Sequence, residues 1–457
     1  MEKESEDKSS GEYPEVYAKA LEILRSYVKP GMHEGLDNIK ALCDELGNPQ
    51  ENFKAVQIAG TNGKTSTSRF SAAILQDQGV STALYTSPEL AERRERMEIA
   101  GEVSSYEDFG QAVVEAYDAD LSARKKFPEM WSSLFEVCTA AAFMLFSDKK
   151  VECAVLEVGL GGRWDATSIK YADVSCITGI GLDHVQILGN TLEEIAGEKA
   201  AVIRKDAPVV FGTGTAITKS VEKLLIERAI KVGAPFYFVR EEGNFSYNSE
   251  LTKENTVVFK ILENPEHIFD ELSIEVKGIY DSYQVSKIAP SYQAQNIACA
   301  IAVSEQYLGQ ALDKDRLQDS IKHCRVPGRF DVFRKNPLAM VDACHNPQSV
   351  EVFLSSLVEV FPNKKDRPDL LLAVLADKDV EGIIRDLSEE FESISVTQTQ
   401  SYRALDYKSL ANKVEEISGK RPKVFASVAE ALDFYEERAF IACGSITLGA
   451  EIARLVK

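Results

Sequence analysis

The stretch KAVQIAGTNGKTS, residues 54–66, decides the fold. Its first six residues form an apolar run, and a helical pattern follows the glycine-containing loop. A loop of this kind between a strand and a helix turns backbone N–H groups toward an anion, and the helix N-terminus adds positive potential. Lys64, expected to be an exposed loop residue, can reach the β- and γ-phosphates of a nucleotide, and Thr65 or Ser66 can contact phosphate or Mg²⁺. The context favours a nucleotide site over an ordinary turn, although Ile58 occupies the position of the first glycine in the usual phosphate loop.

Strand-like and helix-like segments alternate on the C-terminal side of this loop. β-Branched runs bounded by Gly or Pro lie at residues 81–86, 151–158 and 174–180, and helical patterns lie at residues 132–146, 191–204 and 216–229. Such alternation is typical of a parallel sheet with crossover helices. Residues 245–288 break the rhythm and predict added antiparallel strands, followed by a helix from about residue 291 to residue 307.

A second α/β series begins after the turn-rich strip RVPGRFDVF, residues 325–333. It contains the strand-like runs LAMVDA, DLLLAVLA, SISVTQT and AFIACGS, with helical patterns after NPQS and near LANKVEEI. We therefore predict an α/β protein in which a P-loop-containing parallel-sheet ATPase domain precedes a smaller Rossmann-like α/β domain. The expected divisions are a disordered tail at residues 1–12, an N-terminal ATP-binding domain at residues 13–325 and a C-terminal domain at residues 326–457.

The composition excludes several classes of protein. The 457 residues, 44% hydrophobic and 27% charged, are typical of a soluble globular protein with two or three domains. With 52 Lys and Arg against 72 Asp and Glu, the net charge of −20 excludes a general nucleic-acid-binding surface. No apolar run approaches the roughly 20 residues that span a bilayer, and the acidic N-terminus has no apolar signal-peptide region. Eight scattered cysteines without metal-site spacing favour a reduced, cytoplasmic protein.

Three polar residues near the ends of these elements are candidates for a site. Glu157 ends the run VECAVLE, at the sheet edge where parallel strands bind ligands, and beside a phosphate loop this is the place of a Mg²⁺ carboxylate. His184, in GLDHVQ, follows another strand and is either a metal ligand or a packed loop residue. Lys199 lies on a largely apolar helix, where the simple expectation is an ion pair with Glu194 or Glu198.

Polar residues also mark the junction between the two predicted domains. Arg329 lies in PGRF, and Asp342 and His345 lie in VDACHNPQS at the end of a predicted strand. Their positions indicate parts of an interdomain cleft.

Ten strings, in order along the chain, resemble the folylpolyglutamate synthase/dihydrofolate synthase family, a branch of the Mur ligase superfamily. They are GTNGKTS, YTSPEL with ERM, LFEVCTAAAF, LEVGLGGRWDATS, GLDHVQILGNTLEEIAGEKAAVIR, QAQNIA, VPGRFDVF, VDACHNPQSV, ADKDVEG and ACGSITL. The family uses ATP to join L-glutamate to a folate-type carboxylate, either dihydropteroate or a tetrahydrofolate. The resemblance therefore implies ATP, two Mg²⁺ ions and a monovalent cation as cofactors. It also implies small-molecule substrates, no nucleic-acid or membrane partner, and a monomer.

The resemblance further implies roles for individual residues. Those expected to bind ATP are Asn62, Gly63, Lys64, Thr65, Ser66, Asn296, Arg329 and Asp342. Those expected to ligate magnesium are Ser87, Glu157, His184 and Lys199, the last as a CO₂-derived carbamate. Those expected to bind the folate are Phe135, Glu136, Trp164, Asp165 and Ala166. Those expected to bind glutamate are His345 and Ser445, and the expected catalytic residues are Lys64, Lys199 and His345.

Four positions depart from the family pattern. The loop reads GKTS where GKGS is usual, and Glu89 replaces a histidine next to the Ser87 position. Trp164 stands where a leucine is common and Thr447 where an aromatic residue is frequent, which leaves the substrate preference open. Two alternatives remain: a Mur-type ligase acting on a cell-wall precursor, and a nucleotide-binding regulatory or motor-type protein without ligase chemistry. PGRF and LFEVCTAAAF argue against the first, and a second α/β domain with DACHNP argues against the second.

The implied chemistry has two steps. ATP phosphorylates the carboxylate to an acyl phosphate, and the amine of glutamate then attacks it. Lys64, Arg329 and two Mg²⁺ would neutralise the triphosphate and the developing charge, and His345 could orient or deprotonate the amine. Because an acyl phosphate hydrolyses in water, two domains closing over the site would have a physical purpose.

Overall fold

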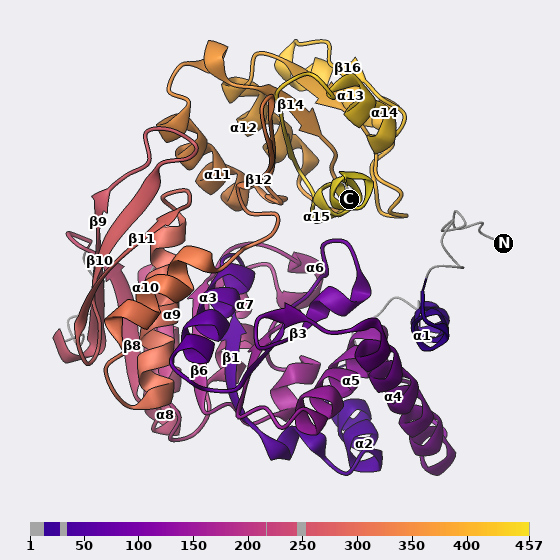
Figure 1. The fold of residues 1–457 in the computed structure, drawn as a ribbon, viewed down its shortest axis with the longest axis vertical. Helices are drawn as coiled ribbons and strands as arrows, with labels where there is room; N and C mark the ends of the chain where they lie inside the picture. Colours follow the sequence, from indigo (N-terminus) through magenta and orange to yellow (C-terminus); the bar gives the residue numbers. More distant parts are fainter. Residues whose placement is uncertain (1–12, 28–33, 216, 245–252, 457) are drawn as a thin grey trace.

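The protein is described by a computed structural model that covers residues 13–27, 34–215, 217–244 and 253–456. The tail predicted at residues 1–12 lies outside the described residues. Within them the chain forms two sheets with flanking helices, one in each half of the molecule (Figure 1). None of the helices in these ranges combines the length and the apolar character that crossing a bilayer requires.

The larger sheet contains the phosphate-loop strand near its middle. Its eleven strands in the described ranges are β1 (Lys54–Ala59), β2 (Thr82–Tyr85), β3 (Met97–Ile99), β4 (Glu102–Val103), β5 (Cys153–Glu157), β6 (Val174–Gly179), β7 (Val209–Gly214), β8 (Phe236–Glu241), β9 (Thr256–Glu263), β10 (Glu271–Lys277) and β11 (Ser282–Ile288). They lie in the order β11-β10-β9-β8-β7-β6-β1-β5-β2-β3-β4. The strands from β2 to β9 in this order are parallel, and β10 and β11 continue antiparallel. The predicted antiparallel pairing is thus confirmed for β9 and β10, and β11 adds a further antiparallel strand.

Ten helices of the described residues flank this sheet. They are α1 (Glu15–Ser26), α2 (Asp37–Glu45), α3 (Lys64–Asp77), α4 (Tyr106–Lys126), α5 (Leu134–Asp148), α6 (Val185–Leu188), α7 (Leu192–Lys199), α8 (Lys219–Val232), α9 (Gln293–Leu308) and α10 (Lys314–His323). The helix predicted at residues 191–204 ends at Lys199 and continues as a short 3₁₀ turn, Ala200–Val202.

Alternation along β1 explains the layers. Val56 and Ile58 face one side of the sheet and pack with side chains of α3, α9 and α10. Ala55 faces the other side with α1, α2, α4 and α5, and Ala59 packs there with residues of α7 and α8. Because side chains of a strand alternate between faces, a strand covered on both sides reads as the continuous apolar run seen in the sequence.

The smaller sheet forms the second α/β unit. Its strands in the described ranges are β12 (Asp331–Lys335), β13 (Leu338–Val341), β14 (Asp369–Leu372), β15 (Ile394–Val396), β16 (Lys423–Val424) and β17 (Phe440–Cys443). They lie in the order β12-β13-β17-β14-β15-β16, and only the β12–β13 pair is antiparallel. Its helices are α11 (Pro347–Val360), α12 (Val380–Glu390), α13 (Tyr407–Ser418), α14 (Val428–Phe434) and α15 (Ile446–Val456).

The two sheets confirm the predicted fold class. The first belongs to the larger, parallel-rich unit and the second to the smaller α/β unit, which lies above it in Figure 1. The predicted boundary at residue 325 falls in the segment between the end of α10 and the start of β12. The boundary itself stays a prediction.

Candidate active site

The carboxyl ends of the central parallel strands open into a large cavity between the two sheets. Its volume is about 1440 Å³, and residues of both units line it. Ligands of open α/β sheets bind at this edge, where loops leave neighbouring strands. The predicted site residues in the lining are Asn62, Gly63, Lys64, Thr65, Ser66, Ser87, Glu157, His184, Lys199, Asn296, Arg329, Asp342 and His345.

The phosphate loop has a shape that only glycine permits at two positions. Gly60 and Gly63 have φ values of +154° and +83°. A Cβ on Gly60 would lie 2.0 Å from Thr178 Oγ1, and a Cβ on Gly63 would lie 2.6 Å from Asn296 Oδ1. Thr178 also donates through Oγ1 to the carbonyl oxygen of Asn62 at 2.5 Å. The end of β6 and the start of α9 therefore fix the loop, whose backbone approaches its neighbours too closely for a side chain.

Lys64 is not the exposed loop residue expected from the sequence. It is the first residue of α3 and is half-buried. Its Nζ donates to the carbonyl oxygens of Gly60 at 3.0 Å and Thr61 at 3.2 Å. Burial lowers the pKa of Lys64, while the nearby Glu157 carboxylate opposes this shift. The expectation was wrong because the helix begins at the lysine itself and its ammonium group folds back over the loop.

Glu157 presents a carboxylate oxygen to the cavity from the end of β5. Its Oε1 accepts a hydrogen bond from Thr65 Oγ1 at 2.9 Å, whereas its buried Oε2 has no partner among the described residues. Burial raises the pKa of Glu157, and the nearby Lys64 ammonium lowers it. A buried carboxylate oxygen without a partner is costly unless a cation or donor meets it.

This donor set fits a magnesium ion bound partly through its substrate. The described residues contain no group of three or more His, Cys, Asp and Glu that could hold a metal by itself. Magnesium commonly binds through one or two carboxylates together with water and substrate phosphates. Glu157 and the hydroxyls of Thr65 and Ser87, all in the cavity lining, offer ligands of that kind.

Lys199 is buried at the end of α7, with 4% of its surface exposed. Its Nζ donates to the carbonyl oxygen of Gly60 at 2.9 Å. The expected ion pair with Glu194 or Glu198 is wrong, because Glu194 closes the N-terminal capping box of α7 and Glu198 pairs with Arg163. Burial lowers the pKa of Lys199 to about 7, so a large fraction of its amine is neutral near neutral pH.

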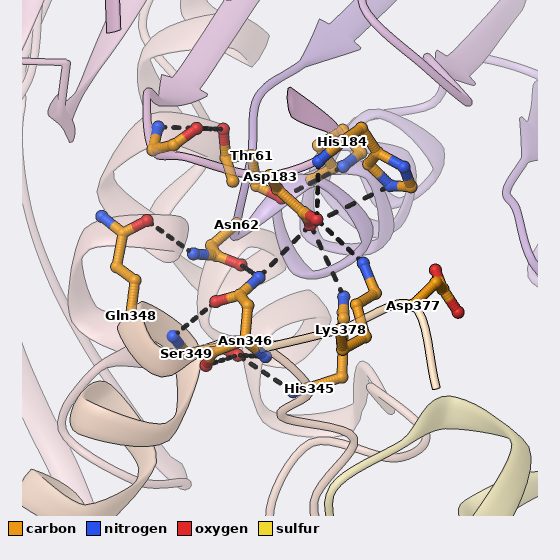
Figure 2. Close-up of polar contacts among 12 residues, drawn as sticks. Thr61, Asn62, Asp183, His184, His345, Asn346, Gln348, Ser349, Asp377 and Lys378 are labelled. Carbon is orange, nitrogen blue, oxygen red and sulfur yellow. Dashed lines mark hydrogen bonds and ion pairs between the residues drawn. The ribbon is translucent and has the colours of Figure 1, made fainter. Parts of the chain in front are cut away.

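Asp183 is the site residue that the sequence analysis missed. Figure 2 shows it at the centre of contacts between the two units. One carboxylate oxygen accepts from Lys378 Nζ at 2.8 Å, and the other lies 3.4 Å from Asn346 Nδ2. The second oxygen is also 3.9 Å from Nε2 of His184 and from Nε2 of His345. Burial opposes ionisation, but the hydrogen bond from Lys378 and the surrounding positive groups hold the pKa of Asp183 well below its usual range.

Two predicted residues of the second unit face the same region. The Nδ1 atom of His345 lies 2.9 Å from the carbonyl oxygen of Ala343, and burial lowers the pKa of His345 to about 4. The neutral ring therefore donates from Nδ1, which leaves the Nε2 lone pair on the side of Asp183. Asp342 is buried, and its Oδ2 accepts from Tyr292 Oη at 3.0 Å and from a backbone N–H of the domain junction. Asp342 thus ties α9 to the second unit.

The remaining predicted site residues do not line this cavity. They are Phe135, Glu136, Trp164, Asp165, Ala166 and Ser445. Glu136 closes the capping box of α5, Asp165 caps the short 3₁₀ helix Ala166–Ile169, and the Ser445 hydroxyl accepts from the backbone N–H of Leu448. Trp164 is 39% exposed. Their predicted roles in binding folate and glutamate stay predictions.

Glu89, which departs from the family pattern, forms ion pairs with two arginines. It lines the cavity and accepts from Arg96 Nε at 2.6 Å and from Arg93 Nη1 at 2.6 Å. The carboxylate that replaces a histidine is therefore neutralised by two arginines.

Both units match family models of Mur ligase domains. The family model of the Mur ligase middle domain matches residues 58–304, and that of the Mur ligase glutamate ligase domain matches residues 328–440. The dihydrofolate synthase/folylpolyglutamate synthase of Mycobacterium tuberculosis is 35% identical over 419 residues, which are 87% of this chain and 81% of that protein. The protein of the same name from Bacillus subtilis is 30% identical over 410 residues, 88% of this chain and 90% of that protein.

Solved structures agree with these relatives. A folylpolyglutamate synthase of Mycobacterium tuberculosis complexed with ADP and AMPPCP has a TM-score of 0.84 and 30% identity, with 96% of this chain and 99% of that chain covered. The folylpolyglutamate synthase of Thermotoga maritima has a TM-score of 0.80 and 29% identity, with 96% of each chain covered. The resemblance seen in the sequence is confirmed: the chain belongs to the folylpolyglutamate synthase/dihydrofolate synthase family of Mur ligases.

Proposed function

We propose that this chain is an ATP-dependent ligase that adds L-glutamate to a folate-type carboxylate through an acyl phosphate. The observation that carries the proposal is one cavity that contains a phosphate loop, a carboxylate oxygen without a partner and residues of a second α/β unit. The names of the relatives from Mycobacterium tuberculosis and Bacillus subtilis support the substrate class. The proposal covers the binding of either folate, dihydropteroate or tetrahydrofolate, and a monomeric protein.

The nucleotide would lie on the loop between β1 and α3. Backbone N–H groups of the loop and the N-terminus of α3 favour phosphate, and Lys64 adds a positive charge. Glu157, with the hydroxyls of Thr65 and Ser87, would hold Mg²⁺, which supplies charge neutralisation at the phosphates when bound. Arg329, in the lining from the domain junction, would reach the triphosphate from the opposite side.

Lys199 would act as an anionic oxygen ligand after reacting with CO₂. The neutral amine attacks the carbon of CO₂, an N–C bond forms, and one proton leaves to solvent. The burial that lowers the pKa of Lys199 supports this reaction, since only the neutral amine is a nucleophile. The product carbamate would offer oxygens to a second Mg²⁺, together with His184. A monovalent cation is proposed on the family resemblance alone.

The second unit would supply glutamate binding and exclude water. His345 lies in the lining with its neutral Nε2 toward Asp183, a position from which it can orient an amine or accept its proton. Ser445 would contact the glutamate only after a local rearrangement, because its hydroxyl caps α15. Contacts across the cavity that exclude water would protect the acyl phosphate from hydrolysis.

A reducing, cytoplasmic location completes the proposal. The structure describes all eight cysteines, each is free, and seven of them are buried. Free buried thiols are typical of proteins that stay in a reducing compartment.

The direct test is the dependence of ADP release on both substrates. Purified protein is incubated with ATP and Mg²⁺, with and without L-glutamate, in separate arms with dihydropteroate, tetrahydrofolate and a muropeptide precursor. We expect ADP release only when glutamate and one of the two folates are present. ADP release that is unchanged when glutamate or folate is omitted would overturn the ligase proposal. Activity with the muropeptide precursor alone would overturn the substrate class.

A further inference from the structure

Gln348 inserts from the second unit into the edge of the first. It lies in the first turn of α11, and its Oε1 accepts a hydrogen bond from Asn62 Nδ2 at 3.0 Å. Figure 2 shows this amide pair beside the loop. The same oxygen lies only 2.0 Å from where a Cβ on Gly181 would be, and the Cδ of Gln348 lies 3.0 Å from it. Gly181 thus forms a notch that the Gln348 side chain fills.

The absence of a side chain at Gly181, rather than its backbone conformation, makes this notch. Gly181 is not among the glycines with positive φ, so alanine can adopt its backbone conformation. It is buried just after β6, and its N–H donates to Thr61 Oγ1 at 3.0 Å. The three nearest heavy atoms to a Cβ at this position all belong to Gln348. A methyl group there would therefore displace the amide end of the Gln348 side chain and meet nothing nearer.

The start of α11 fixes the backbone from which the Gln348 side chain extends. Asn346 is the N-cap of the helix, and its Oδ1 accepts from the backbone N–H of Ser349 at 2.8 Å in a reciprocal capping box. Pro347 restricts the backbone of the first helical position. The Nδ2 of Asn346 also lies 3.5 Å from Asn62 Oδ1, so both ends of the Asn62 amide face this helix.

We propose that Gln348 is a positioning residue that couples the phosphate loop to the second unit. Seated over Gly181, it holds the Asn62 side chain and fixes how closely α11 approaches the loop. The position of α11 in turn sets where His345, in the loop between β13 and α11, meets the cavity. Gln348 acts through these neighbours and does not touch the reacting atoms. The inference rests on the proposed ligase activity for its kinetic readout only.

The test is a double-mutant cycle with Gly181→Ala and Gln348→Ala. The methyl group must push the flexible end of the Gln348 side chain out of the notch, so its expected effect is loss of the hydrogen bond to Asn62, a change of about 2- to 13-fold. We expect G181A to lower kcat severalfold while the Kd for AMPPCP changes less than about threefold, because the loop that holds the nucleotide is intact. We expect Q348A to lower kcat by a similar factor, since the same hydrogen bond is lost. The double variant is expected to equal Q348A, because both substitutions remove the same contact.

Small-angle scattering gives a readout that needs no turnover. With saturating AMPPCP, G181A and Q348A are both expected to have a larger radius of gyration than the wild type, and the double variant is expected to match Q348A. Gly197→Ala is the matched control, because a Cβ at Gly197 meets nothing within 4 Å and its φ is not positive. We expect G197A to match the wild type in both measurements.

Three results would overturn the inference. One is a G181A variant with wild-type kcat and radius of gyration, since the contact would then not form in the working enzyme. Another is a double variant with a defect clearly larger than that of Q348A, since part of the effect of G181A would then lie in the strand end. The third is a tenfold rise in the Kd for AMPPCP in G181A, which would place the effect on the loop alone. Scattering data that fit the inference in a protein without glutamate-dependent ADP release would refute the proposed function and leave the coupling intact.

Discussion

Replacing Lys199 by methionine is expected to stabilise the protein near pH 6 and to lose that effect as the pH approaches 10.5. The lysine is 4% exposed at the end of α7, and its only hydrogen bond from Nζ within the described residues goes to the Gly60 carbonyl. Burial makes the charged form costly, and a methionine of similar length removes that cost without leaving a cavity.

The magnitude follows from the pKa of Lys199, which burial lowers from 10.5 to about 7. At about 1.4 kcal/mol per pKa unit this interval corresponds to about 5 kcal/mol. Between these two pH values the unfolded lysine binds a proton that the folded lysine has released, so the free energy of unfolding of the wild type rises with pH. Below pH 7 both states are protonated and the full penalty is present. Loss of the hydrogen bond to Gly60 offsets the gain by about 1 kcal/mol.

The assay is urea unfolding of wild type and Lys199→Met at several pH values, in CO₂-free buffer without nucleotide. Tryptophan fluorescence suits it, because both tryptophans, Trp131 and Trp164, belong to the larger unit that contains Lys199. Lys205→Met is the matched control, since the Lys205 side chain is 78% exposed and its replacement removes no desolvation penalty.

A difference between Lys199→Met and wild type that does not change with pH would refute the reasoning. It would mean that the Lys199 amine is as well solvated in the folded protein as in the unfolded one. The neutral amine required for a carbamate would then be absent near neutral pH, and the proposed second Mg²⁺ ligand would lose its support.

Three further substitutions test the loop and the contact between the units. Lys64→Ala should reduce folate- and glutamate-dependent ADP release to background. Urea unfolding should show that the free energy of unfolding falls by about 1–2 kcal/mol, because two hydrogen bonds to loop carbonyls disappear. Retained activity would refute the ATP-site assignment. Asp183→Asn should enlarge the radius of gyration with AMPPCP bound, because it leaves the ammonium of Lys378 without its carboxylate. Adding Lys378→Met should partly reverse this change. An equal radius of gyration with and without the Lys378 side chain would contradict the reasoning. Gly60→Ala should abolish AMPPCP binding in calorimetry, because its Cβ would lie 2.0 Å from Thr178 Oγ1, and unchanged affinity would show that the loop can adapt.

Local signals in the sequence were sufficient for the loop and the sheet edge. The run at residues 54–59 forms β1, and α3 begins within the predicted loop, at Lys64. Glu157 ends β5 as expected, because an apolar run that stops at an acidic residue marks the end of a buried strand, although the Glu157 side chain is itself buried. These features depend on hydrogen bonds and side-chain alternation within a few residues, which a pattern can record.

Contacts between the two units could not be read in this way. Asp183 and Lys378 are 195 positions apart, and Gly181 and Gln348 meet only because the two units contact each other beside the cavity. Both strings that carry the first pair, GLDHVQ and ADKDVEG, were recognisable, but nothing in either predicts its partner. Ser445 was assigned to glutamate by resemblance. Its hydroxyl accepts from the backbone N–H of Leu448 in the first turn of α15, and its role in glutamate binding stays a prediction.

The charges in the cavity explain how a protein of net charge −20 can attract a triphosphate. Arg96 and Lys378 are neutralised by carboxylates, through ion pairs of 2.6 Å and 2.8 Å. Lys64 and Arg329 differ, because Lys64 donates to two backbone carbonyl oxygens and Arg329 to one, and among the described residues neither forms a direct ion pair. A carbonyl oxygen satisfies an N–H group without cancelling its charge, and the nearby carboxylate of Glu157 offsets only part of these two charges inside a partly enclosed, low-dielectric space. The acidic surface elsewhere then disfavours anions in general, while the cavity retains the local field that a nucleotide needs.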